Sequence, residues 1–161
     1  MKRHFLLGIL IASITLNGYA DTRPPHAPIL IFVSFSMPDA SIKGWMNEAE
    51  IIHAPVVIRG LIHNSFKETY RKMAELSQNN HGGVQLDPTL FERFHIEKVP
   101  ALVVSSAHPC LPNQTCEEDF DVLYGDVTAE YALTKIMSRD DSVSLIAKEA
   151  LAQLHEAHHA I

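Results

Sequence analysis

The first candidates for a chemical role in this chain are four consecutive residues, Ser36, Met37, Pro38 and Asp39. The seven residues before them, ILIFVSF, have the β-branched and aromatic character of a strand that is buried on both faces. Ser36 and Asp39 have the S-x-x-D spacing of a capping box, which predicts that a helix begins here. The four residues are therefore expected at an exposed helix N-terminus, where free backbone N–H groups favour negative charge.

Ser36 is a candidate nucleophile only if a base activates it. The field of a helix N-terminus contributes at most ~2 kcal/mol, which is too little to ionise a hydroxyl. The sequence FSFSMP is not a nucleophile elbow, and no pattern places a His-Asp pair beside it. We therefore interpret Ser36 as a helix cap and Asp39 as a capping acid, and we expect no catalytic residue.

The two cysteines, Cys110 and Cys116, are separated by five residues. In an oxidising compartment such a pair is expected to form a structural disulfide that closes a surface loop. A redox pair would need the C-x-x-C spacing at a helix start, and a metal site would need further ligands. We therefore assign the two thiols a structural role.

Two other clusters could hold a metal ion. His155, His158 and His159 have the i, i+3, i+4 spacing of one helix face, although such a cluster is more often a solvated helix end. The acidic run from Glu117 to Asp119 lacks the glycine and the alternating spacing of a calcium loop. We expect no metal and no cofactor, and a metal carrier that uses the histidines remains an alternative.

The first twenty residues have the pattern of a secretory leader. Lys2 and Arg3 precede an apolar stretch and the small-x-small signal that ends at Ala20. Removal of the leader takes two positive charges and no acidic one, so the formal net charge moves from −6 to −8. This charge argues against a nucleic-acid surface, and no other stretch is long enough to enter a bilayer. The mature chain is expected to be soluble in an extracytoplasmic space.

The elements that must position these residues follow in the order β-α-β-α, a linking segment, β-β-α and a further helix. After a proline-rich lead-in over 21–28, strands are expected at 29–35, 56–62, 84–87, 100–106 and 121–125. Capping boxes and apolar periodicity predict helices at 38–52, from Ser65 onward, at 88–94, from Asp126 to Met137, and from Val143 to about His158. On the second of these helices the predicted buried stripe is Phe66, Tyr70, Met73 and Ala74. The last helix could pack on the others or offer its apolar stripe to a partner.

This order predicts an α/β protein with a thioredoxin-like fold, in which a central mixed sheet is flanked by helices and an extra C-terminal helix is added. The thioredoxin-like domain is expected over 29–139 and the extra helix over 140–161. In that architecture, the four residues from Ser36 to Asp39 occupy the corner that would carry a C-x-x-C motif. Without sulfur nucleophiles, the corner cannot exchange disulfides.

Three segments also resemble one protein family in order and spacing: VSFSMPDASIKGW, PVVIRGLIHNSFKET and GGVQLDPTLFERFHIEKVPALVV. They resemble the F-type conjugative-transfer pilin assembly proteins of the TrbC kind, over roughly Ile29 to Ile136. The resemblance implies a periplasmic thioredoxin-like protein of a type IV secretion system that helps to assemble the conjugative pilus beside envelope proteins such as TraW. It implies no catalytic activity. In the wider thioredoxin superfamily, a cis-proline loop faces the corner and pairs with extended peptides. The resemblance places this loop at Val99 and Pro100.

The sequence thus favours a non-enzymatic assembly factor that binds envelope proteins at a corner formed by Ser36 to Asp39, Val99 and Pro100. A periplasmic disulfide-handling chaperone or isomerase is the alternative. The oligomeric state stays open. Longer members of the family have an additional N-terminal region, where this chain has only the short lead-in.

Overall fold

The computed structural model describes residues 27–78, 83–106, 119–139 and 142–159. The expected leader, most of the lead-in and both cysteines lie outside these ranges. The leader and disulfide predictions are therefore not addressed by the described residues. No helix in the described ranges is both long and apolar enough to span a membrane.

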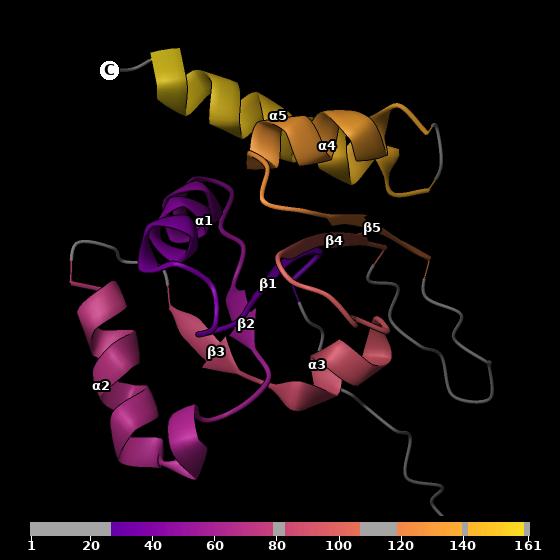
Figure 1. The fold of residues 1–161 in the computed structure, drawn as a ribbon. Coiled ribbons are helices and arrows are strands. Elements are labelled where there is room, and N and C mark those ends of the chain that lie inside the picture. The colour runs from indigo at the N-terminus through magenta and orange to yellow at the C-terminus, as the bar shows by residue number, and fades with distance from the viewer. Residues whose placement is uncertain (1–26, 79–82, 107–118, 140–141, 160–161) are drawn as a thin grey trace, which may run out of the picture.

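Five strands form one mixed sheet in the order β3-β2-β1-β4-β5 (Figure 1). Their bounds are β1 Ile29–Val33, β2 Val56–Ile58, β3 Val84–Leu86, β4 Ala101–Ser105 and β5 Phe120–Tyr124. β1, β2 and β3 run parallel, whereas β4 runs antiparallel to both β1 and β5. The prediction that the second strand is a parallel neighbour of the first is confirmed.

Five α-helices and one short 3-10 helix connect and cover the strands in the described ranges. Their bounds are α1 Asp39–Ile51, η1 Ile62–Asn64, α2 Phe66–Leu76, α3 Pro88–Arg93, α4 Ala129–Met137 and α5 Ser144–His159. Every helix expected from the sequence is present within a few residues of its predicted start. The predicted mixed sheet flanked by helices is therefore confirmed.

The sheet separates two apolar layers because side chains alternate between the faces of each strand. On one face, Ile31, Val33 and Leu102 pack with buried side chains of α1, α4 and α5. On the other face, Phe32 packs edge-on against Phe91 of α3, with ring centroids 4.8 Å apart. Figure 1 shows α1, α4 and α5 together on one side of the sheet and α3 on the other. β1 is buried on both faces, as its unbroken apolar sequence predicted.

The C-terminal helix α5 lies against α4 and also contacts α1. Its inward residues are Ala147, Ala150, Leu151 and Leu154, and Val143 just before the helix is equally buried. These residues belong to the same apolar cluster as Trp45 and Met46 of α1. The expected apolar stripe therefore packs on the other helices, and most of it is not available to a partner.

Two sequence predictions about the helices are wrong. Asp126 does not cap α4, because Thr128 is the N-cap residue and its hydroxyl accepts the N–H of Tyr131. On α2, Phe66 and Tyr70 are 73% and 76% exposed, and Ala74 is exposed as well. Met73, the fourth residue of the predicted stripe, is half-buried and packs against the core, and the buried residues of α2 are Thr69 and Leu76.

The second predicted strand is also shorter than expected. β2 ends at Ile58, and the chain then turns through Arg59 and Gly60 into η1. The apolar residues Leu61 and Ile62 are half-buried and lie outside the sheet, Leu61 just before η1 and Ile62 as its first residue. The run VVIRGLI therefore divides at its arginine, the residue that interrupts the apolar pattern.

Candidate functional site

The corner predicted from the sequence lies between β1 and α1. β1 ends at Val33, and a turn follows in which the N–H of Met37 donates to the carbonyl of Ser34 at 3.0 Å. Pro38 is the N-cap residue of α1, and Asp39 is its first helical residue. Ser36, Pro38 and Asp39 are exposed, and Met37 is half-buried.

The predicted capping box is wrong. Within the described ranges no side chain caps α1. Ser36 lies two residues before the N-cap position, and its hydroxyl is 3.0 Å from that of Ser34. The Ser34 hydroxyl also accepts the N–H of Ser36 at 3.2 Å. The two serines thus stabilise the turn and leave the first turn of α1 without a side-chain acceptor.

Asp39 makes an ion pair across helices instead of capping one. Its carboxylate accepts a hydrogen bond from the ammonium group of Lys72 on α2. Lys72 is 25% exposed and Asp39 is 54% exposed in their side chains, so water screens the pair only in part. The contact joins the start of α1 to the middle of α2.

Val99 and Pro100 precede β4 at the same end of the sheet as the corner. Ala101, the first residue of β4, is the register partner of Phe32, and the corner turn begins two residues after Phe32. The peptide bond between Val99 and Pro100 is cis. Pro100 is buried and its carbonyl accepts the N–H of Gly125, whereas Val99 is half-buried. The pairing of β1 with β4 therefore brings the two predicted halves of the corner to the same end of the sheet.

A pocket of about 380 Å³ opens beside the corner, between the loop after β1 and the loop after β2. The apolar residues Phe35, Ile58, Leu61 and Ile62 contribute to its walls. Its polar lining comes from Ser34, Ser36, Arg59, Gly60, His63 and Lys72. The pocket lies at the carboxyl ends of two adjacent parallel strands, which is the usual place for ligands in open α/β sheets.

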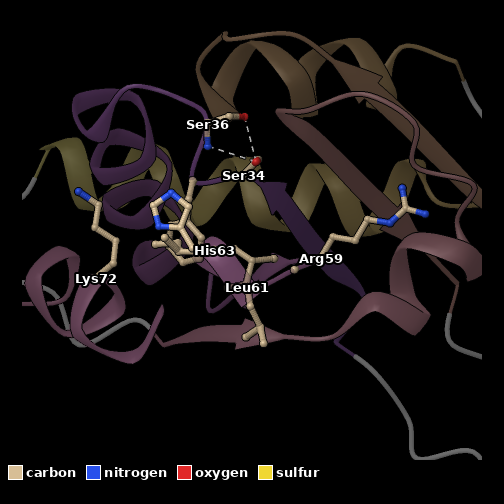
Figure 2. A pocket seen from close by; sticks show the side chains of 10 residues that line it. Ser34, Ser36, Arg59, Leu61, His63 and Lys72 are labelled. Carbon is tan, nitrogen blue, oxygen red and sulfur yellow. Dashed lines mark hydrogen bonds between the residues drawn. The ribbon is translucent and has the colours of Figure 1, made fainter. Parts of the chain in front are cut away.

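The basic side chains at this pocket are directed to groups that do not line it. The guanidinium of Arg59 stacks over the ring of Phe91, 5.8 Å from its centroid. His63, which has a left-handed backbone with φ of 47°, lies 3.0 Å from the carboxylate of Glu68. Figure 2 shows the side chain of Lys72 extending away from Ser34 and Ser36. The centre of the pocket is consequently suited to an apolar group and not to an anion.

Sequence reasoning missed this pocket because its residues come from three separate segments. The only available signal was the division of VVIRGLI at Arg59. The pocket adjoins Ser36 but its lining does not include Val99 or Pro100. The predicted corner and the pocket are therefore neighbouring features that share Ser36.

Two carboxylates hold the helix behind the corner. Asp126 accepts hydrogen bonds from the hydroxyl of Ser41 at 2.8 Å and from the indole N–H of Trp45 at 3.3 Å. Glu48 of α1 accepts the backbone N–H of Ala129, the first residue of α4. Burial raises the pKa of the Glu48 carboxyl above its usual value, while the Ala129 N–H and nearby His158 act in the opposite direction. Together these contacts set the position of α1 relative to α4.

One of the three C-terminal histidines has an acidic neighbour. His155 of α5 lies 3.0 Å from the carboxylate of Glu130 on α4. The described residues contain no group of three or more His, Cys, Asp or Glu side chains arranged to hold a metal ion. The acidic run from Glu117 to Asp119 lies almost entirely outside the described ranges.

Comparisons with known proteins identify relatives of this chain. Residues 31–136 match the model of the type-F conjugative transfer system pilin assembly proteins, TrbC. The chain is 33% identical over 118 residues to the periplasmic protein TrbC of Escherichia coli strain K12, which covers 73% of this chain and 51% of the relative. The chain therefore spans about half the length of the curated relative it matches. No solved structure matches the chain.

The match begins inside β1 and ends inside α4, so it contains the corner, the pocket, the end of β1 and the other four strands. It confirms the family that the three quoted segments predicted, and the location of the relative confirms the expected periplasmic location. The structure and the comparisons together lead to one conclusion: this chain belongs to the type-F TrbC family of conjugative pilin assembly proteins.

Proposed function

We propose that the chain is a non-enzymatic periplasmic assembly factor for the conjugative pilus of a type IV secretion system. It binds an extended segment of an envelope partner at the corner formed by Ser36 to Asp39, Val99 and Pro100. The observation that carries the proposal is the absence of a side-chain cap at the start of α1, beside the loop that precedes β4. The backbone N–H groups of the first helical turn remain available to acceptors of a partner.

The proposed scaffold is thioredoxin-like. Support comes from the unit β1-α1-β2 and the unit β4-β5-α4, which meet where β1 and β4 pair antiparallel. A cis proline directly before β4 agrees with the loop that the family resemblance carries over to Val99 and Pro100. In such a scaffold, a peptide lies along the cis-proline loop and forms β-type hydrogen bonds.

The partner we propose is a TraW-like protein of the same envelope apparatus. The family is defined by its role in pilin assembly, so other transfer proteins are the natural candidates. The pocket beside Ser36 would accept an apolar side chain of the bound segment, because its walls include Phe35, Ile58 and Leu61. The backbone contacts would provide affinity and the pocket would provide specificity.

A disulfide-handling role receives no support from the corner. None of the residues Ser36, Met37, Pro38 and Asp39 carries a thiol, and a thiolate is the group that attacks a disulfide. We expect the purified protein to show no activity in an insulin-reduction assay. Reduction at a rate above that of the reductant alone would overturn the non-enzymatic part of the proposal.

The binding proposal is tested by two substitutions at one position. Asp39→Pro removes a backbone N–H from the first helical turn, where proline is tolerated and fits the helix. Asp39→Ala keeps that N–H, and both variants lose the carboxylate that pairs with Lys72. We expect lower co-purification of envelope proteins and fewer pili for Asp39→Pro than for Asp39→Ala. Circular dichroism at equal concentration controls for folding.

Val99 provides the second arm of the test. Val99→Arg places a long charged side chain on a half-buried position of the loop before β4, and should displace a bound segment. Lys98→Ala, at the exposed neighbouring position, is the control. The binding proposal is wrong if Asp39→Pro and Val99→Arg fold normally and support the same pilus production and the same co-purified proteins as their controls.

A further inference from the structure

α2 presents an apolar stripe on its outer surface. Phe66, Tyr70 and Ala74 follow one another at i, i+4 and i+8, and all three are exposed. Phe66 and Tyr70 are exposed to 73% and 76%, although aromatic side chains of this size are usually well buried. The stripe has the periodicity of a packing face and yet faces away from its own domain.

The orientation of α2 follows from its contacts on the opposite side. Thr69 is buried, and its hydroxyl accepts the N–H of Ile62 and donates to the carbonyl of Ser65. Leu76 is buried in the main apolar cluster, and Lys72 reaches Asp39 on α1. These contacts hold α2 in one rotation about its axis. Rotation to bury Phe66 and Tyr70 would break all of them.

Charges of both signs lie along one side of the stripe. Lys67 and Arg71 lie near its N-terminal half, and Glu75 lies at its C-terminal end, 3.8 Å from Arg71. All three side chains are exposed. Lys67 and Glu75 are eight residues apart, which corresponds to about 12 Å along a helix.

We infer that this face of α2 binds the same face of a second copy of the chain, with the two helices antiparallel about a two-fold axis near Tyr70. In that arrangement Phe66 of one copy lies opposite Ala74 of the other, so that a large side chain meets a small one. Antiparallel helices bring the same flank of each copy together, so Lys67 lies opposite Glu75 of the second copy. A two-fold axis repeats both contacts and also brings the two Arg71 side chains together near the axis, where each lies 3.8 Å from Glu75 of its own copy.

The pattern of charges favours a second copy over an anionic membrane. A membrane-binding helix would carry mainly Lys and Arg beside its aromatic residues. Here Glu68 and Glu75 lie on the same helix as three cations, and the whole chain has a formal net charge of −6. A face that carries complementary charges at its two ends matches its own inverted copy. This inference concerns α2 and does not depend on the binding corner proposed above.

The first experiment measures self-association of the mature protein by sedimentation equilibrium over a range of concentrations. We expect a monomer–dimer equilibrium for the unmodified protein. Tyr70→Asp should weaken the dimer about tenfold or more, because a central aromatic residue carries much of the binding energy of an interface. Leu145→Asp on α5 is the matched control, since Leu145 is 75% exposed and lies on another helix. It should leave the dimer unchanged.

The second experiment uses charge reversal to test the geometry. Lys67→Glu and Glu75→Lys should each weaken the dimer about threefold or more, because each places like charges opposite one another twice. The double variant should recover the original association. An equimolar mixture of the two single variants should form a heterodimer, because each then supplies the charge that the other lacks.

Three results would overturn the inference. The unmodified protein could be monomeric at every concentration reached, or Tyr70→Asp could dimerise as well as Leu145→Asp does. The charge variants could also fail to complement each other in the mixture. Binding of unmodified monomers to vesicles with anionic lipids, lost in Tyr70→Asp, would assign the face to a membrane instead.

Discussion

Glu48 of α1 accepts a hydrogen bond from the backbone N–H of Ala129, the residue at which α4 begins. The two residues are 81 positions apart in the chain. A side chain from one helix thus supplies an acceptor for an N–H group that the other helix cannot satisfy within itself. This contact couples the helix behind the proposed binding corner to the C-terminal pair of helices.

Removal of this acceptor should destabilise the protein. Glu48→Ala leaves the Ala129 N–H without its partner, and we expect the free energy of unfolding to fall by about 1 kcal/mol. Glu48→Gln keeps an oxygen acceptor and should lose less. Urea denaturation at pH 7 measures both changes. Equal stability of the alanine variant and the unmodified protein would show that water replaces the carboxylate without cost.

The same carboxyl should make stability depend on pH. Its pKa is raised above 4.5 in the folded protein, mainly by burial, so the folded state holds this proton to a higher pH than the unfolded state does. Its contribution to stability is therefore fully present below pH 4.5 and is lost as pH rises through the raised pKa. Relative to Glu48→Gln, the unmodified protein should be most stable below pH 4.5 and lose that advantage above it.

Urea midpoints measured for both proteins at pH values below and above 4.5 test the direction of the change in stability. Glu149→Gln, which removes an exposed carboxylate from α5, controls for a general effect of net charge. Parallel curves for the unmodified protein and Glu48→Gln would contradict the raised pKa.

Asp126 should contribute to the stability of the fold because one of the two groups that donate hydrogen bonds to it is buried. Trp45 is 3% exposed, and its indole N–H donates to the Asp126 carboxylate. Asp126→Ala would leave that N–H unpaired, and we expect a loss of about 1–3 kcal/mol in unfolding free energy. Ser41→Ala removes only the more exposed of the two bonds and should cost less. The single tryptophan of the chain reports the unfolding by fluorescence.

Two serines that look alike in the sequence should respond differently to substitution. Ser65 caps α2 by accepting the N–H of Glu68, so Ser65→Ala should reduce stability by about 1 kcal/mol. Ser36 caps no helix, and Ser36→Ala should change stability by less than about 0.5 kcal/mol. Thermal denaturation of both variants checks this order. A larger loss for Ser36→Ala would restore the capping role that the sequence suggested.

The contribution of α5 to the stability of the fold is tested by substituting two leucines of this helix. Leu154 is fully buried against the other helices, and Leu154→Ala should cost about 2–5 kcal/mol. Leu145 is 75% exposed, and Leu145→Ala should change stability by less than about 0.5 kcal/mol. Denaturant unfolding distinguishes the two. A small loss at Leu154 would mean that α5 packs only weakly on α4 and α1.

Most of the fold could be predicted because its signals are local. The apolar run of β1, the cap at Ser65 and the proline at the start of α3 each mark an element within a few residues. The buried stripes of α1 and α4 follow from apolar spacing at the helical period, and Trp45 and Met46 of α1 lie in the core. The order of these elements was sufficient to predict a mixed sheet flanked by helices.

The candidate site was predicted only in part. The four corner residues were identified because they follow a strongly apolar run with the spacing of a helix start. Val99 and Pro100 were assigned to the corner through the family resemblance. The role assigned to Ser36 was wrong, since a hydroxyl two residues away, that of Ser34, competes for the same local hydrogen bonds. The pocket lined by Ile58, Leu61 and Lys72 could not be read from any single segment.

The amino-acid pattern alone was enough to place the strands, the helix starts and the family. It could not say which side of α2 would be buried, because Phe66, Tyr70 and Ala74 have the same period as a core-facing stripe. The choice depended on partners distant in the chain: Lys72 reaches Asp39, and Leu76 reaches the core. Periodicity reports that a face is apolar, whereas packing determines what that face meets.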